Sequence, residues 1–345
     1  MDYRNYYLNK TILITGGAGA IGRNLVESLS ILNAKKVIVL DNLSSSYLWN
    51  IPNKENVLFI KGDIRNDDDL KRAFHHKPTI VFHLAAFFAN QNSVDYPLIC
   101  EDVNNRGTLM LLEYCIIAGN IERFIYTNSE GGAYGDDCTL PFSENEISLQ
   151  LGSPYYVTKM CGESYCYYYH KHYKLPISVV RLFNSYGPGE VPGQYRNVIP
   201  NFIFWALKKQ PLTLTGDNEI SRDFVFVNQT VEGILRAGYY NDAIGTSINI
   251  ATEQETFIYK LAELINLKTG NQAGFKILKQ RKWDRRKKII GNNKKCQEIL
   301  NFKPYTDIEL GLDLTIAWFI ENWKNIEKSA EFAPGINPAL DIEKE

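Results

Sequence analysis

The feature that most limits how this chain can fold is a regular alternation of short apolar runs with helix-length segments over roughly the first 180 residues. The runs are rich in β-branched residues and nearly continuously apolar, which is typical of strands in a parallel sheet covered by helices on both faces. The six predicted strands span residues 10–16, 35–42, 57–64, 79–86, 123–129 and 177–184. We therefore predict a doubly wound α/β domain with a parallel sheet.

The pattern becomes irregular after the sixth strand, where several predicted helices and one further strand follow. Residues 1–184 are predicted to form the sheet domain, which the segment 222–250 rejoins. Residues 185–221 and 251–330 are predicted to form a smaller, mostly helical second domain. The final stretch, 331–345, is polar and contains prolines, so we expect a loosely ordered tail.

Charge and cysteine content exclude several classes of function. The chain has 38 Lys and Arg against 39 Asp and Glu, so no overall field attracts nucleic acid or an anionic membrane. Its six cysteines form no CxxC pair, which favours reduced thiols over a disulfide framework or a zinc site. No apolar run approaches the length of about 18 residues that a spanning helix needs, and the N-terminus lacks the apolar region of a signal peptide. We expect a cytoplasmic protein with no metal, no membrane span and no nucleic-acid partner.

Two compositionally unusual stretches have ordinary explanations. The basic run KQRKWDRRKK (279–288) is typical of a solvated face with one or two arginines directed at a phosphate. The aromatic run YCYYYHKHY (165–173) indicates packing between helices or at a subunit interface. From the second run we expect a homodimer that forms through a helix bundle.

The segment TGGAGAIG, residues 15–22, joins the first predicted strand to the first predicted helix. Its glycines permit a tight turn, close approach of the backbone to a pyrophosphate, and close packing of helix on sheet, while the helix N-terminus faces the phosphates. This context predicts a dinucleotide-binding loop. The residues expected to contact the cofactor here are Gly16, Gly19, Ala20, Ile21 and Gly22.

The ends of the next strands complete this predicted cofactor site. Asp41, with Asn42 beside it, ends the second strand 19 residues after Gly22, where a carboxylate would accept both hydroxyls of the adenosine ribose. No arginine follows in DNLSSS to bind a 2′-phosphate, which favours NAD over NADP, although Arg23 keeps that choice open. The residues predicted to contact the cofactor at the ends of the third and fourth strands are Asp63, Ile64, Leu84, Ala85 and Ala86.

Tyr155 and Lys159, in SPYYVTK, lie four residues apart on a predicted helix and therefore project from one face. A free phenol titrates at about pH 10, too high for a base at neutral pH. A nearby ammonium lowers such a pKa by about 1–3 units, and a positively charged nicotinamide would add to the effect. We predict Tyr155 as a catalytic base and Lys159 as its partner; Tyr156 has Met160 at the corresponding position.

In this order, the motifs resemble the extended short-chain dehydrogenase/reductase family, specifically its nucleotide-sugar epimerase, dehydratase and decarboxylase branch. The resemblance covers Lys10 to about residue 325 and includes TGxxGxxG, GDI, HLAA, SPYxxxK, RLFNxYGP, NVIP, RDFVFV and RxxD. It implies a Rossmann-type sheet domain, a second domain that binds substrate, NAD as cofactor and a nucleoside-diphosphate sugar as substrate. Lys159 would then also bind the nicotinamide ribose.

The resemblance also implies roles for residues outside the cofactor motifs. Asn104 looks like the asparagine that lies close to the cofactor and the active-site helix. Two arginines are expected to clamp the substrate diphosphate, a task that suits bidentate guanidinium geometry. The residues expected around that diphosphate are Asn184, Asn197, Arg222 and Arg281, with Arg285 as a competitor of Arg281.

The segment TNSEGGAYG, residues 127–135, is one residue longer than the family's Ser/Thr-rich segment that runs into VYG. Counting forward from the strand places Ser129 at the family's catalytic Ser/Thr, whereas counting backward from Tyr134 places Glu130 there. We favour Ser129, because strand register is rigid and the Gly131–Gly132 turn can absorb an insertion. Glu130 stays open, as either an acid or base or a turn residue.

The same segment bears on the reaction type. The family's 4,6-dehydratases carry Thr-Asp-Glu here, where the forward count gives Ser129, Glu130 and Gly131. Its decarboxylases carry Thr-Ser-Glu, which fits only if Asn128 takes the position of the hydroxyl. We therefore expect an NAD-dependent epimerase that acts at C4 of the sugar through a transient 4-keto intermediate. The alternatives are a 4,6-dehydratase, a UDP-glucuronate decarboxylase, or a catalytically silent subunit that binds nucleotide sugars.

Overall fold

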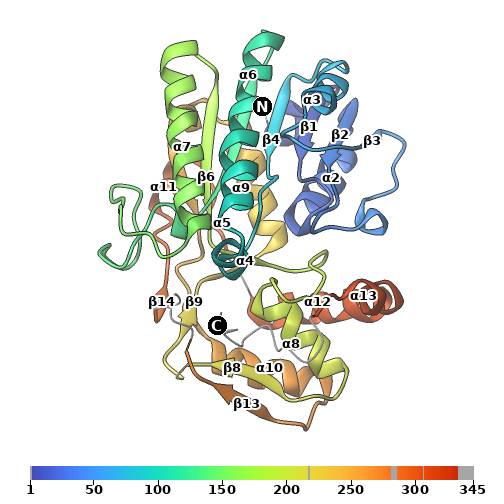
Figure 1. The fold of residues 1–345 in the computed structure, drawn as a ribbon, viewed down its shortest axis with the longest axis vertical. Helices are drawn as coiled ribbons and strands as arrows, with labels where there is room; N and C mark the ends of the chain where they lie inside the picture. Colours follow the sequence, from blue (N-terminus) through green and yellow to red (C-terminus); the bar gives the residue numbers. More distant parts are fainter. Residues whose placement is uncertain (1, 217, 281–285, 306, 333–345) are drawn as a thin grey trace.

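The structure is a computed structural model that describes residues 2–216, 218–280, 286–305 and 307–332. The described residues contain a seven-stranded parallel sheet with the strand order β11-β6-β5-β4-β1-β2-β3 (Figure 1). Its strands are β1 Thr11–Thr15, β2 Lys36–Asp41, β3 Val57–Lys61, β4 Ile80–His83, β5 Arg123–Ser129, β6 Ile177–Leu182 and β11 Ser247–Ile250. All six strands predicted for the first domain are present, and the doubly wound α/β fold is confirmed.

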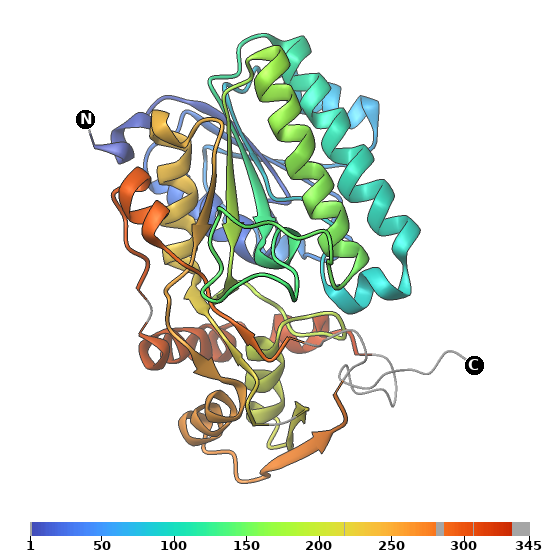
Figure 2. The same ribbon diagram turned by 90° about the vertical axis from the view of Figure 1, so that its left-hand side faces the viewer.

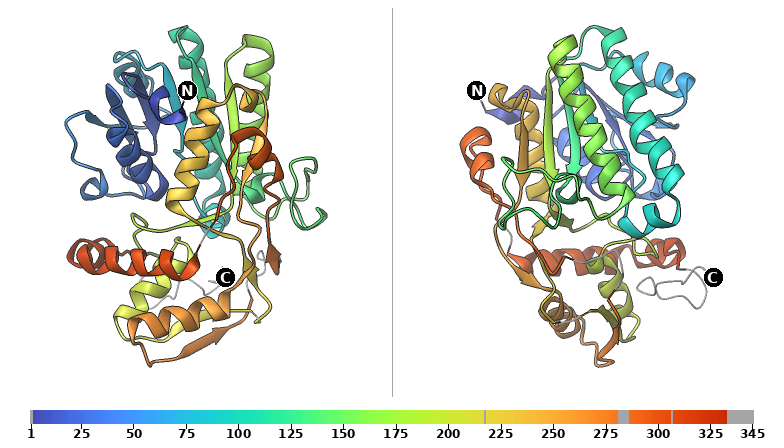
Figure 3. Two further views of the ribbon diagram at one scale, coloured as in Figure 1. Left: turned by 180° about the vertical axis from the view of Figure 1, so that it is seen from behind. Right: turned by 60° about the vertical axis from the view of Figure 1, so that its left-hand side comes forward.

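Helices cover both faces of this sheet. Helices α6 and α7 lie side by side on one face (Figure 2), while α9 crosses the other face (Figure 3, left). Each face has its own buried apolar cluster, so the strands are apolar on both sides as their composition predicts. The helices of this part are α1 Tyr3–Tyr6, α2 Ala20–Ile31, α3 Asp67–Phe74, α4 Asn90–Asp95, α5 Pro97–Glu101, α6 Gly107–Ala118, α7 Pro154–Tyr173 and α9 Val227–Tyr239.

A second part of the chain lies beyond the carboxyl ends of the strands (Figure 1). It has its own buried apolar cluster, built mainly from its helices and the paired strands β8 and β13. Its helices are α8 Val198–Leu207, α10 Ile258–Thr269, α12 Ile308–Glu321 and α13 Trp323–Ser329. Its short strands are β7 Asn184–Tyr186, β8 Leu212–Thr215, β9 Ser221–Arg222, β10 Phe224–Phe226, β12 Thr256–Phe257, β13 Phe275–Leu278 and β14 Lys288–Ile289.

The chain passes between the two parts more than once. After β9 and β10 it returns to the main sheet, where Ile248 of β11 pairs with Val180 of β6. The predicted boundary at residue 251 assigns α11, Lys294–Leu300, to the second domain. In the structure α11 packs on α9 and β11 instead, and both Cys296 and Leu300 are fully buried in the cluster of the main sheet. The amphipathic pattern of α11 shows a buried face but does not show which surface covers it.

The outer side of the α6–α7 pair carries exposed apolar side chains, including Ile117, Val157, Tyr168 and Tyr173. The aromatic run at 165–173 places the expected dimer contact on α7, and that contact stays a prediction. Within the described residues, no helix combines the length and the apolar character that crossing a membrane requires.

Candidate active site

A cavity of about 810 Å³ lies between the carboxyl edge of the sheet and the second part of the chain. Its volume is within the range of about 300–1,000 Å³ found for small-molecule sites. The sequence-predicted site residues that line it are Gly16, Gly19, Ala20, Ile21, Gly22, Asp41, Asn42, Asp63, Ile64, Leu84, Ala85, Ala86, Ser129, Glu130, Tyr155, Lys159, Asn184, Asn197 and Arg222. Asn104 is not among the lining residues, and Arg281 lies outside the described residues.

The glycine loop has the geometry that a pyrophosphate site requires. Gly16 has a positive φ of 72°, and a Cβ there would come within 2.6 Å of Ala85 N. A Cβ on Gly22 would overlap Gly16 O, so glycine permits the close contact between helix and loop. Helix α2 begins directly after Gly19 without a side-chain cap, which leaves backbone N–H groups available for an anion at its N-terminus.

Asp41 links the glycine loop to the loop after β2 at the predicted ribose site. Its carboxylate accepts hydrogen bonds from Ala18 N at 3.0 Å, Leu43 N at 2.9 Å and Ser46 Oγ at 2.8 Å. Arg23 was the residue that could have favoured NADP by binding its 2′-phosphate. Its Nε donates to Asn50 O at 3.1 Å instead, and Arg23 does not line the cavity. The geometry therefore places an acidic acceptor rather than a cation at the end of β2, which fits NAD.

Asp63, the acidic residue after β3, is held in its ionised form. Arg65 donates to it through Nε at 2.9 Å and Nη2 at 2.8 Å, and Asn42 Nδ2 donates at 2.9 Å. The side-chain hydrogen bonds from Arg65 are the main cause that lowers the pKa of Asp63 to about 2. At neutral pH the carboxylate is thus an acceptor at the cavity wall, as a contact with the adenine amine requires.

Ser129 is the last residue of β5, opposite Leu182 of β6, so the strand itself sets its position. Its hydroxyl donates to Glu130 Oε2 at 2.9 Å and accepts from Gly131 N at 3.2 Å. Glu130 is 7% exposed, and its Oε1 accepts from Tyr156 Oη at 3.3 Å. The two residues therefore act as one hydrogen-bonded pair at the end of the strand.

The glycine pair after Glu130 is required by packing against α7. A Cβ on Gly131 would overlap the ring of Tyr156, and one on Gly132 would overlap Asn128 Oδ1 and lie 2.9 Å from Lys159 Cβ. Only glycines let this helix lie directly on the turn. The extra residue inferred in this turn stays a prediction.

Tyr155 and Lys159 project from α7 into the cavity, as their spacing predicts. The Tyr155 ring packs edge-on against Phe88 at 5.9 Å, and its hydroxyl makes no hydrogen bond with any described residue. Lys159 Nζ lies 4.3 Å from the centroid of the Tyr126 ring, and burial lowers the pKa of Lys159 to about 8.

The pKa of Tyr155 differs from the sequence-based expectation. We expected Lys159 to lower it, but burial, with the Glu130 carboxylate second, raises the pKa of Tyr155 above that of a free tyrosine. The neighbouring Tyr156 is engaged instead: its hydroxyl donates to Glu130 and accepts from Asn90 Nδ2 at 2.9 Å.

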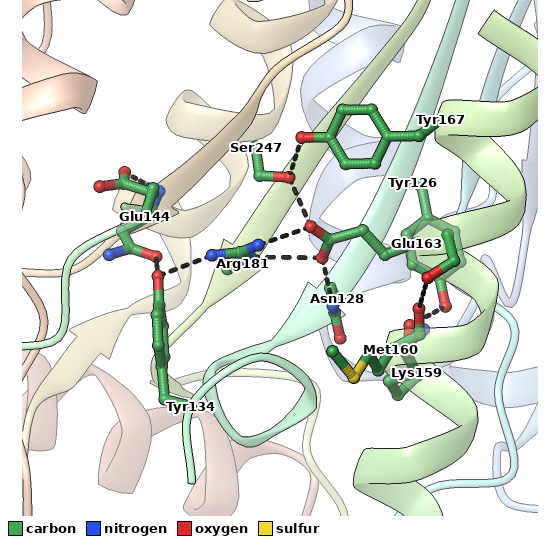
Figure 4. A network of polar contacts seen from close by, with 12 residues as sticks. Tyr126, Asn128, Tyr134, Glu144, Lys159, Met160, Glu163, Tyr167, Arg181 and Ser247 are labelled. Carbon is green, nitrogen blue, oxygen red and sulfur yellow. Dashed lines mark hydrogen bonds and ion pairs between the residues drawn. The ribbon is translucent and has the colours of Figure 1, made fainter. Parts of the chain in front are cut away.

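Asn128, the residue before Ser129, belongs to a buried polar network with Glu163 and Arg181 (Figure 4). Arg181 Nη2 donates to Glu163 Oε1 at 2.6 Å, and both side chains are less than one-tenth exposed. Glu163 also accepts from Ser247 Oγ at 2.6 Å and from Asn128 Nδ2, while Asn128 Oδ1 accepts from Ser129 N at 2.7 Å. Although burial opposes its charge, the Glu163 carboxylate raises the pKa of Arg181. The ion pair thus fixes Asn128, and Asn128 fixes the backbone of Ser129.

Asn104 acts on the active-site helix rather than on the cavity. It lies in η2, a π-helical turn spanning Asp102–Arg106, and is buried. Its Nδ2 donates to Thr158 Oγ1 at 2.9 Å, next to Lys159, and its Oδ1 accepts from Phe87 N at 2.7 Å. Asn104 therefore joins α7 to the loop after β4, and its expected place near the cofactor stays a prediction.

Of the residues predicted for the substrate diphosphate, the described ones, Asn184, Asn197 and Arg222, line the cavity from the second part of the chain. Asn197 donates through Nδ2 to Glu190 Oε1 at 2.8 Å, and Arg222 donates through Nη1 to Ser221 O at 2.8 Å. Burial raises the pKa of Glu190 to about 7. Sequence reasoning assigned no role to four lining residues, Asn90, Tyr156, Glu190 and Arg286. Asn90 and Glu190 lie in none of the motifs, Tyr156 was set aside in favour of Tyr155, and Arg286 was one of several cations in the basic run.

His83, the last residue of β4, gives a testable pH dependence. It is buried between Thr15 Oγ1 at 2.7 Å and Thr108 Oγ1 at 2.9 Å, and burial lowers its pKa to about 3. An unfolded histidine titrates at about 6.5, so between pH 6.5 and 3 the unfolded chain binds a proton that the folded chain does not. The contribution of His83 to the free energy of unfolding should therefore fall by up to about 1.4 kcal/mol per pH unit as pH drops through this window.

Urea unfolding at several pH values between 7.5 and 4 measures this slope. His83→Gln should reduce the slope by up to one proton, whereas His172→Gln, at an exposed position, should not. Equal slopes for the wild type and His83→Gln would show that His83 is not the group responsible.

The fold, the glycine loop and the Tyr155–Lys159 pair in one cavity define the chain as an extended short-chain dehydrogenase/reductase. More narrowly, residues 12–251 match the NAD dependent epimerase/dehydratase family, and the chain belongs to that family. NAD is the cofactor by which the family is named, and solved relatives have been determined with NAD⁺ or NADH bound.

Individual relatives align with nearly the whole chain. The structure of an epimerase from Methanothermobacter thermautotrophicus is 48% identical, covers 96% of this chain and 98% of its own, and has a TM-score of 0.94. WbmF of Bordetella bronchiseptica, solved with NAD⁺ and UDP, is 34% identical over 94% of this chain and 96% of its own, with a TM-score of 0.81. The UDP-glucose 4-epimerase of Mycolicibacterium smegmatis is 32% identical over 89% of this chain and 97% of its own.

Relatives at 30–32% identity are also named UDP-glucuronate 4-epimerase, dTDP-D-glucose 4,6-dehydratase and UDP-N-acetyl-alpha-D-glucosaminuronate decarboxylase. Overall similarity therefore supports the nucleotide-sugar class, while the reaction type has to be argued from the site.

Proposed function

We propose that this protein is an NAD-dependent nucleoside-diphosphate-sugar epimerase that inverts C4 of the sugar through a transient 4-keto intermediate. The observation that carries the proposal is the position of the Tyr155 hydroxyl. Tyr155 lines the same cavity as the Ser129–Glu130 pair and the glycine loop suited to a pyrophosphate, and it lies on the same helix face as Lys159. Relatives named as UDP-glucose 4-epimerases support the same class.

Each of these residues has a part in the proposed reaction. Bound NAD supplies the hydride acceptor for C4. The Tyr155 oxygen accepts the proton of the C4 hydroxyl, and the ammonium of Lys159 stabilises the resulting charge and binds the ribose. The Ser129 hydroxyl hydrogen-bonds O4 and orients it. After the keto sugar turns its other face, C4 would regain the hydride on that face while Tyr155 returns the proton to O4, so that C4 is inverted.

The helix dipole and an oxidised nicotinamide would act in the direction that Tyr155 needs. Tyr155 lies in the first turn of α7, which begins at Pro154, where the helix macrodipole favours negative charge. The positive charge of an oxidised nicotinamide would oppose the rise in the pKa of Tyr155 that burial and Glu130 cause.

The surroundings of Glu130 favour an epimerase over a dehydratase. Glu130 is bonded to Ser129 and Tyr156, and the next position is Gly131, where the Tyr156 ring fills the space of any side chain. The site therefore offers one acid at this turn, whereas the dehydratase pattern uses two. We propose that Glu130 holds Ser129 and Tyr156 in place.

Replacing Glu130 tests this role. Glu130→Gln keeps one acceptor oxygen and offers an amide N–H to the other hydroxyl, which can accept it, so kcat should fall less than tenfold, whereas Glu130→Ala leaves Ser129 unsupported and should lower kcat further. The measurement is kcat on the best nucleotide sugar. A hundredfold loss in Glu130→Gln, equal to about 2.7 kcal/mol of transition-state stabilisation, would identify Glu130 as an acid or base and favour the dehydratase or decarboxylase.

The reaction itself is tested with a panel of UDP-, GDP-, CDP- and dTDP-sugars and NMR of the products. The expected product is the C4 epimer, with neither water nor carbon dioxide released. A 4-keto-6-deoxy sugar or a pentose would contradict the proposal, and binding without any product would indicate a silent subunit.

A further inference from the structure

Arg286 is a charged side chain of the cavity that the proposed mechanism does not use. It precedes β14, lines the cavity, and is 10% exposed. Its Nε lies 3.3 Å from Asp136 Oδ1, and its guanidinium lies 5.3 Å from the ring centroid of Tyr156 and 5.9 Å from that of Phe142. Both terminal nitrogens, Nη1 and Nη2, are buried without a hydrogen-bond partner among the described residues.

These two terminal nitrogens have a specific chemical complement. Buried polar groups in native proteins are nearly always hydrogen-bonded, and a charged donor left unpaired is especially unfavourable. The N–H groups of one guanidinium form a planar fork that matches the two oxygens of a carboxylate or of a phosphate. The arrangement at Arg286 therefore calls for an oxyanion supplied from the cavity.

The neighbours of Arg286 place that oxyanion at the sugar end of the cavity. The guanidinium stacks on Tyr156, the Tyr156 hydroxyl donates to Glu130, and Glu130 is bonded to Ser129, the proposed contact of O4. Arg222, the described arginine predicted for the diphosphate, is on β9 and donates instead to Ser221 O and Lys287 O.

From this geometry we infer that Arg286 binds a carboxylate carried by the sugar, so that the substrate class is an acidic nucleotide sugar such as a uronate. This inference rests on the proposed function, since it assigns the substrate of the same site. The two carboxylates that line this side, Asp136 and Glu130, are already engaged, by Arg286 Nε and by Ser129 and Tyr156. Without Arg286 they would repel a third carboxylate, so its loss should weaken acidic sugars selectively.

Calorimetric binding to the NAD-loaded protein tests the assignment with UDP-glucuronate, UDP-glucose and UDP as probes. Arg286→Met should weaken UDP-glucuronate at least tenfold and change UDP-glucose and UDP less than twofold. Arg286→Lys should lose part of the affinity for UDP-glucuronate, because an ammonium keeps the charge but not the bidentate geometry. Lys287→Met is the matched control, because this neighbouring, half-exposed cation pairs with Glu219. Its loss should leave the relative affinities for UDP-glucuronate, UDP-glucose and UDP unchanged.

Two results would overturn the inference. Equal weakening of all three probes would make Arg286 part of the diphosphate site, and unchanged binding of all three would reduce it to packing on Tyr156 and Phe142. Should Arg286→Met fail to fold, the question is decided by Arg286→Lys, from the ratio of its affinities for UDP-glucuronate and UDP-glucose. Product NMR on the same samples tests the proposed function separately. If neither sugar is epimerised, the epimerase assignment fails, while the binding ratios still decide the role of Arg286.

Discussion

Tyr155→Phe is expected to lower kcat by about 10²–10⁴-fold, the range that removal of a general acid–base group costs. The change deletes one oxygen that faces the cavity and makes no hydrogen bond with a described residue, and it keeps the ring that packs on Phe88. Folding and NAD binding should therefore stay close to those of the wild type. Turnover by product NMR and NAD affinity by calorimetry check the two halves of the prediction.

Tyr156→Phe is the matched control, because it removes a hydroxyl of the same type one residue away. That hydroxyl joins Glu130 to Asn90, so its loss should loosen the turn and lower kcat less than about tenfold, the effect of one hydrogen bond of about 1 kcal/mol. If Tyr155→Phe were active and Tyr156→Phe inactive, the base would be Tyr156 rather than Tyr155. Wild-type activity in both variants would show that neither tyrosine hydroxyl is the catalytic base.

The parts of the site that sequence predicts well depend on local patterns. The strands are identified by nearly continuous apolar runs, because both faces of a parallel sheet are buried. The strand ends then share one edge, which explains why Gly16, Asp41, Asp63 and Ser129 line the same cavity. The (i, i+4) spacing of a helix in turn places Tyr155 and Lys159 on one face.

The parts that sequence does not predict depend on contacts between distant segments. Nothing near Arg181 indicates that its partner is Glu163, 18 residues earlier on a helix. Burial raises the pKa of Tyr155, and the spacing of residues in the sequence does not show how deeply a side chain is buried. Arg286 was one of several cations in a basic run, and only its burial distinguishes it. Such features require the packed structure.

Glu163→Leu should destabilise the protein by about 3–5 kcal/mol, because it leaves the buried guanidinium of Arg181 without its counter-charge. Ser247 and Asn128 lose an acceptor in the same step. Since Asn128 fixes Ser129, kcat should also fall in the protein that stays folded. The free energy of unfolding from urea titration and kcat at low temperature measure these effects. Glu298→Gln, in an exposed (i, i+4) pair with Lys294, should cost no more than about 0.5 kcal/mol.

A second substitution separates charge from packing in this network. In Glu163→Leu with Arg181→Met both charges are gone and the volume is largely kept, so much of the stability should return, although Asn128 and Ser247 still lack an acceptor. Activity should not return to the same extent, because Asn128 remains unsupported behind Ser129. The double-mutant cycle isolates the coupling between Glu163 and Arg181, and strictly additive losses would show that the two charges do not stabilise each other. Recovery of stability together with full kcat would instead show that the network holds the fold but does not position Ser129.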